Sequence, residues 1–195
     1  SDINNNDISP FNFLPPESEV ILNINNLNNT KEVLSKNKNL SSISSSKNKI
    51  LNQLNSLSKK KSNNSGLLSL TPFGKNQIAY TYIRETNTQD SISKSDIEKG
   101  EYQENKIFID TTLLKDVYKT ILGNYIISSN EDIILENIIR DYNKANQKID
   151  SDFYKLVKAA DKNDPFNVFT KTKKLNWEPE VTIKEGFLRT IKSYL

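Results

Sequence analysis

Apolar and polar residues alternate in several short segments of this chain of 195 residues, which is the pattern of a half-buried β-strand. Val20, Leu22 and Ile24, for example, fall on one face of a strand predicted at 19–25. The same reasoning predicts six strands in all, at residues 19–25, 77–85, 102–110, 117–122, 125–128 and 166–170.

The segment 116–143 gives the clearest prediction. Two runs rich in β-branched and aromatic residues flank Gly123-Asn124, a pair that favours a two-residue hairpin turn because both residues tolerate positive φ. Ser129-Asn130 then supplies a helix cap. A broad apolar stripe at helical spacing follows, formed by Ile134, Leu135, Ile138, Ile139 and Tyr142.

Helical periodicity predicts three further helices, at 26–37, 46–57 and 152–160. Most consecutive strands are too close in sequence for parallel crossovers. We therefore predict an α+β fold, a largely antiparallel sheet of about six strands with helices packed on one face. The expected organisation is a flexible leader at 1–12, the α+β domain at 13–174 and a C-terminal strand and helix appendage at 175–195.

The composition excludes several kinds of chemistry. The chain has no Cys and no His, so disulfides, cysteine nucleophiles, Ser-His-Asp triads and His-based zinc sites are ruled out. Its five glycines are too far apart to form a dinucleotide-binding loop. Glu98, Glu101 and Glu104 are interpreted as a solvated acidic loop rather than a cation site. We therefore predict no catalytic residue, cofactor or metal ligand.

A lysine-rich segment at 36–75 contains eight lysines and no acidic residue. Lys59, Lys60 and Lys61 are the candidate residues if this segment binds an anionic surface or nucleic acid. Phe73 is its only aromatic residue and it has no arginine, so base stacking and base reading are not indicated. We interpret the segment as a solvated helix and loop, and we predict no nucleic-acid partner.

Four tyrosines lie at alternating positions of the predicted strands. Tyr80, Tyr82, Tyr118 and Tyr125 are candidates for an exposed interaction surface, because tyrosine is common in protein interfaces. The alternative is that they belong to the core.

The order of these elements resembles a family of bacterial envelope proteins of unknown function, lipid-anchored or secreted, over about 13–174. The motifs are Leu14-Pro15 before the first strand, the Gly123-Asn124 hairpin, and a short helix with the Asp-x-x-Phe motif of Asp150 to Phe153. The resemblance implies a cell-envelope location outside the cytoplasm, in the periplasm or on the outer surface. It carries over no catalytic residue. It also implies other envelope proteins as partners, and membrane attachment only through an N-terminal anchor outside this chain.

The last twenty residues are separately similar to the C-terminal tail of NAD-dependent nucleotide-sugar epimerases and dehydratases. The similarity rests on the Trp177-x-Pro179 segment and the helix that follows it. The Tyr-x-x-x-Lys pair of that family matches Tyr154 and Lys158, a spacing that chance supplies in a lysine-rich chain. This hypothesis requires parallel βαβ units.

Three functions are thus in competition. The leading hypothesis is a non-enzymatic envelope domain for binding or assembly. The second is a fragment of, or fusion to, an epimerase or dehydratase. The third is a binder of anionic surfaces or nucleic acid through the lysine-rich segment.

Overall fold

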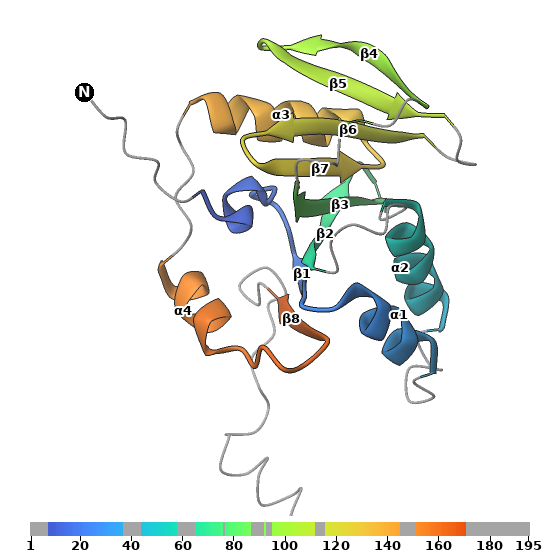
Figure 1. The fold of residues 1–195 in the computed structure, drawn as a ribbon, viewed down its shortest axis with the longest axis vertical. Coiled ribbons are helices and arrows are strands. Elements are labelled where there is room, and N and C mark those ends of the chain that lie inside the picture. Colours follow the sequence, from blue (N-terminus) through green and yellow to red (C-terminus); the bar gives the residue numbers. More distant parts are fainter. Residues whose placement is uncertain are drawn as a thin grey trace, which may run out of the picture.

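The computed structural model describes residues 8–36, 44–57, 65–75, 77–86, 92, 95–111, 116–144 and 151–170. These residues form one antiparallel sheet with helices beside it (Figure 1). The strands are β1 (Val20–Ile24), β2 (Gly66–Phe73), β3 (Gln77–Glu85), β4 (Asp96–Tyr102), β5 (Asn105–Asp110), β6 (Val117–Leu122), β7 (Tyr125–Ser129) and β8 (Phe166–Thr170). The helices are η1 (Pro10–Phe13, a 3-10 helix), α1 (Leu27–Lys36), α2 (Ser44–Leu57), α3 (Asp132–Asn143) and α4 (Ser151–Ala159).

The strand order across the sheet is β4-β5-β6-β7-β3-β2-β1-β8, and every pairing is antiparallel. The predicted α+β class and antiparallel sheet are confirmed. The described residues contain no parallel strand pair, so they do not form the βαβ units that the epimerase hypothesis requires.

The sheet has eight strands rather than the six predicted, because β2 and β4 were not foreseen. β2 crosses the middle of the sheet, and its adjacent residues Leu67 and Leu68 are both buried, one on each face. A strand buried on both faces shows no alternation in its sequence. β4 has the opposite character, since it is mostly charged and exposed and therefore resembles a loop.

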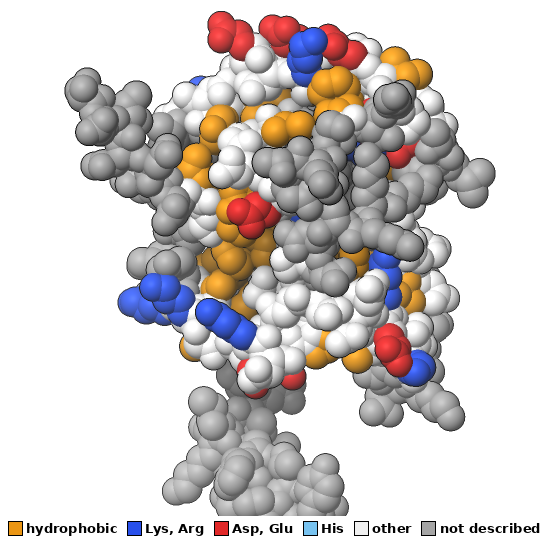
Figure 2. Space-filling view, viewed as in Figure 1, with side chains coloured by type: hydrophobic (Ala, Val, Ile, Leu, Met, Phe, Trp, Pro, Cys, Tyr) orange, Lys and Arg blue, Asp and Glu red, His pale blue; other side chains and the backbone are white. Residues whose placement is uncertain are grey.

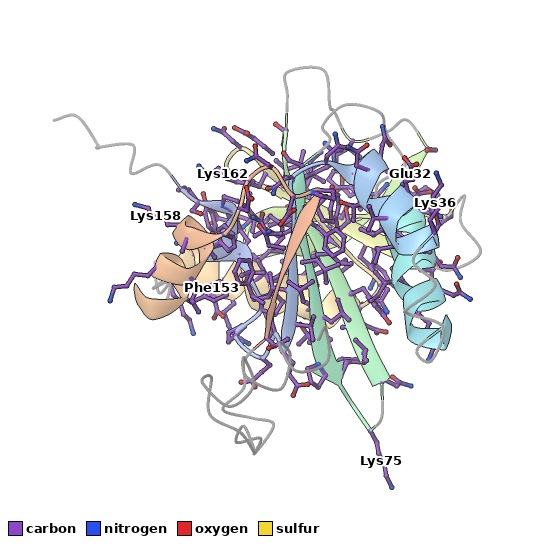
Figure 3. All side chains as sticks on the ribbon, turned by 90° about the horizontal axis from the view of Figure 1, so that it is seen from below. Glu32, Lys36, Lys75, Phe153, Lys158 and Lys162 are labelled. Carbon is purple, nitrogen blue, oxygen red and sulfur yellow. The ribbon has the colours of Figure 1, made fainter. Side chains whose placement is uncertain are left out.

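Helices cover both faces of the sheet, so the prediction that they lie on one face is met only in part. On the first face, η1 and α3 pack over an apolar cluster that includes Phe13, Ile83 and Leu135. On the second face, α1 and α2 pack over a cluster that includes Leu54 and Tyr82. Seen from below, α4 lies on one side of the sheet and α1 and α2 lie on the other (Figure 3).

A row of small hydroxyl residues crosses the first face. Ser69 of β2, Thr81 of β3 and Ser129 of β7 are direct neighbours in register, and all three are buried. Ser18 lies above this row; its Oγ donates to the Pro15 carbonyl at 2.6 Å and is 2.6 Å from Ser69 Oγ. The small side chains leave room for the chain between η1 and β1 to pass close to the sheet.

The predicted hairpin is present between β6 and β7. Leu122 pairs with Tyr125 across the two-residue turn, and Gly123 has φ of +55°, the left-handed region that glycine enters at little steric cost. The predicted Ser129-Asn130 cap was wrong, because helix α3 begins after Glu131 with no side-chain cap. Asn130 Oδ1 instead accepts the Tyr80 backbone N–H at 2.6 Å and ties the start of α3 to β3.

The described part of the domain extends further toward the N-terminus than predicted. η1 begins at Pro10 and is capped by Ser9, and the Phe11 side chain packs against the first-face cluster. Residues 1–7 of the predicted leader and all of 171–195, which include the predicted appendage, lie outside the described residues.

Gly66 provides a test of how closely β2 and β3 approach each other. A Cβ added there would lie 2.8 Å from both the Ile83 carbonyl oxygen and Tyr82 Oη. We expect Gly66→Ala to lower the free energy of unfolding by about 1–3 kcal/mol, the usual cost of overpacking. The control is Gly100→Ala, where an added Cβ has nothing within 4 Å. Chemical denaturation of both variants measures the difference, and equal stabilities would contradict this packing.

Candidate functional site

The most prominent charged cluster among the described residues joins three strands. Lys119 Nζ of β6 donates to Asp96 Oδ1 of β4 at 2.8 Å and to Asp110 Oδ2 of β5 at 3.0 Å. The three side chains are 16%, 2% and 6% exposed, respectively. The sequence does not indicate this cluster, because its members are distant in the chain and β4 was not predicted.

This cluster has the properties of a structural ion pair. Asp96 and Asp110 are direct cross-strand neighbours, so their carboxylates would repel each other without a cation between them. The Lys119 ammonium lies between them and directs two of its donors at the two carboxylates. The arrangement therefore joins β4 to β5 and β6. The described residues contain no group of three or more Asp and Glu side chains placed to hold a metal ion.

The four candidate tyrosines do not share one face. Tyr80 and Tyr82 belong to the second-face cluster and are only 7% and 1% exposed, so the core alternative applies to them. Tyr118 and Tyr125 lie on the first face and are partly buried against its cluster. Tyr118 also packs under the Lys99 ammonium, 4.5 Å from its ring centroid, and Tyr125 Oη donates to the Ile8 carbonyl at 2.8 Å.

The other candidate residues from the sequence do not form one site among the described residues. Lys59, Lys60 and Lys61 lie outside the described residues, as does the side chain of Tyr154. Lys158 points away from the sheet on α4 (Figure 3). The acidic residues Glu98 and Glu101 belong to β4, and acidic side chains gather at that end of the sheet (Figure 2).

The two edges of the sheet differ in chemistry. β4 carries three acidic residues and one lysine among its seven residues, and its register shifts by a bulge between Glu98 and Gly100. Charges and bulges are the usual protection of an edge strand against pairing with another chain. β8 reads Phe-Asn-Val-Phe-Thr, with no charge and no proline, and it pairs with β1 without a bulge. No described strand lies on its outer side.

The backbone groups that β8 presents at this edge follow from its register. The Asn25 N–H donates to the Pro165 carbonyl at 2.9 Å, so these two residues form a hydrogen-bonded pair. Hydrogen-bonded pairs alternate along an antiparallel ladder, so the N–H and C=O groups of Asn167 also face β1. The N–H and C=O groups of Phe166, Val168 and Thr170 then point outward.

Side chains hold β8 in place from the first face. The Phe169 ring makes an edge-to-face contact with Phe153 of α4 at 5.6 Å, and Phe153 makes another with Phe11 of η1 at 5.8 Å. The Val168 side chain lies on the second face and remains 53% exposed. Figure 3 shows β8 at the front of the view from below, between α4 and the α1–α2 pair. Within the part of the chain that the structure describes, β8 is thus packed on its first face and has no strand on its outer edge.

Comparison with known proteins found no matching family model, no matching curated protein and no matching solved structure. Among the described residues, no helix has the length and apolar character needed to cross a bilayer.

Removing the cation from the three-strand cluster is expected to be costly. Lys119→Met leaves two nearly buried carboxylates side by side, and we expect the free energy of unfolding to fall by about 3–5 kcal/mol. Adding Asp110→Asn to that variant should restore part of the loss. Lys106→Met is the control, because the ion pair of Lys106 with Glu98 is exposed. The free energy of unfolding of this variant should be nearly unchanged. Similar losses from Lys119→Met and Lys106→Met would argue against a structural role for the cluster.

Alkaline titration tests the burial of Tyr82. Burial raises the pKa of Tyr82 to about 12, with a smaller opposing effect from Arg84. Because the folded pKa lies above the unfolded value near 10, its contribution to stability is complete below about pH 10. That contribution is lost as the pH rises through about 12, and amounts to roughly 2–3 kcal/mol. Denaturant unfolding at several pH values should give a shallower decline for Tyr82→Phe than for the parent protein, and parallel curves would refute the assignment.

Proposed function

We propose that this chain is a non-enzymatic domain of the bacterial cell envelope with a role in binding or assembly, and that it binds through the outer edge of β8. The observation that carries the proposal is the contrast between the edges: β4 is charged and bulged, whereas β8 is uncharged and in regular register. An unprotected edge strand is suited to take another strand by backbone hydrogen bonding.

The pairing and packing of β8 support this role. All five of its residues pair with β1, and Phe169 is fixed by Phe153. A strand that is already ordered loses little conformational entropy when a second strand adds to it. The outward N–H and C=O groups of three residues would supply affinity. The exposed Val168 side chain would supply an apolar contact.

The envelope location rests on the family resemblance described from the sequence. Its motifs occupy structural positions in the fold: Leu14-Pro15 precede β1, Gly123-Asn124 form the β6–β7 turn, and Phe153 anchors β8. The motif residues named here thus occupy structural positions: before a strand, in a turn and in an aromatic contact. This is consistent with a domain whose task is to present a surface.

Photocrosslinking in intact cells tests the proposed binding edge and the location together. A photoreactive amino acid at Val168 should give a crosslinked protein product, and the product should be found in the envelope fraction. The matched control places the same amino acid at Ile97, which is 58% exposed on the protected β4 edge; this position should give none. Products from both positions, no product from Val168, or a cytosolic product would count against the proposal.

A further inference from the structure

We propose that the strand that occupies the β8 edge comes from a second copy of this chain, so that two sheets join into one through β8 of each copy. This inference rests on the proposed binding role of the edge and names its partner. It follows from the backbone register of β8, from the exposed side chain at its centre and from the charges that precede it.

The register allows β8 to pair with itself. Phe166, Val168 and Thr170 present outward backbone groups, and Val168 is the middle residue of the strand. An antiparallel copy related by a two-fold axis would place Val168 opposite Val168 of the second copy, and Phe166 opposite Thr170 of the second copy. Each of these pairs brings two outward-facing residues together and exchanges both of its backbone hydrogen bonds. The backbone groups of every residue of the strand then have a partner, either in β1 or in the second copy.

The same arrangement covers the exposed apolar side chain at the centre. Residues directly opposite each other in an antiparallel pair have side chains on the same face. The two Val168 side chains would therefore touch across the axis on the second face, where each is 53% exposed in the single chain. Valine is well suited to such a cross-strand contact.

The charges that precede β8 favour the antiparallel orientation. The four residues 161–164 before the strand contain two aspartates and one lysine. A parallel arrangement would bring the aspartates of the two copies together and would be repulsive, whereas antiparallel pairing keeps them at opposite ends of the joined strands. β4 is less suited to the same arrangement, because pairing centred on its middle residue would place Lys99 opposite Lys99.

Two variants of the full chain that introduce opposite charges at Val168 give a direct test. The full-length protein should be a dimer by sedimentation equilibrium at concentrations up to about 100 μM. Val168→Lys and Val168→Glu should each be monomeric, because like charges would meet at the two-fold axis. An equal mixture of the two variants, one of them uniformly isotope-labelled, should form a dimer that contains one chain of each, which native mass spectrometry then resolves by mass.

Two further variants control for misfolding and for a general effect of adding charge to an exposed apolar position. Val168→Pro removes only an N–H that points away from β1, so it should abolish the dimer while thermal unfolding remains cooperative. Ile97→Lys, an exposed apolar residue of the other edge, should leave the dimer intact.

Each remaining result overturns the proposal. A monomeric parent protein means that another occupant, such as residues 171–195 of the same chain, covers the edge, or that nothing does. A dimer that persists in all Val168 variants means that the contact lies elsewhere. Monomers in the mixture exclude the two-fold register. A Val168 crosslink to a different protein, with a monomeric parent, would leave the proposed function intact and reject only the second copy.

Discussion

The whole fold depends on the burial of β3 from both sides. The five consecutive residues from Ala79 to Ile83 are all buried, with alternate side chains in the first-face and second-face clusters. A strand in this position must be covered on both faces. Short helices, together with the segment between η1 and β1, cover it. The small hydroxyl row allows the cover on the first face to lie close, and the larger tyrosines fill the space beneath α1 and α2 on the second. Removing either layer would expose a strand that has no polar side.

Elements could be predicted from the sequence where local turn and helix preferences agreed with burial in the folded protein. The β6–β7 hairpin and α3 were predicted because the Gly123-Asn124 turn and the apolar stripe act locally. β2 was missed because burial on both faces removes the alternation, and β4 was missed because it is stabilised by Lys119 rather than by an apolar face of its own. The placement of helices on both faces could not be predicted, because the apolar stripe of a helix does not indicate which face of the sheet the helix packs against.

The candidate site was even less accessible from sequence. Composition excludes histidine and cysteine chemistry, and the tyrosines that suggested a surface lie largely against the core. What distinguishes β8 is its position at the end of the strand order, and position in a sheet is a property of topology. A five-residue uncharged strand has the same sequence character at an edge as in the centre. Only the pairing of β8 with β1 shows which of its backbone groups remain available.

The place of β8 beside β1 has a consequence for synthesis of the chain. β1 is apolar at four of its five positions, and its partner on one side is encoded about 140 residues later. At roughly 5–20 residues added per second, a newly made β1 stays without that partner for several seconds or longer, while β2 through β7 can already assemble. During this interval the nascent sheet ends in an apolar edge. Among the described strands, β8 thus replaces an apolar edge with one whose only large exposed apolar side chain is Val168, so the synthesis of β8 sets how long the apolar edge of β1 stays uncovered.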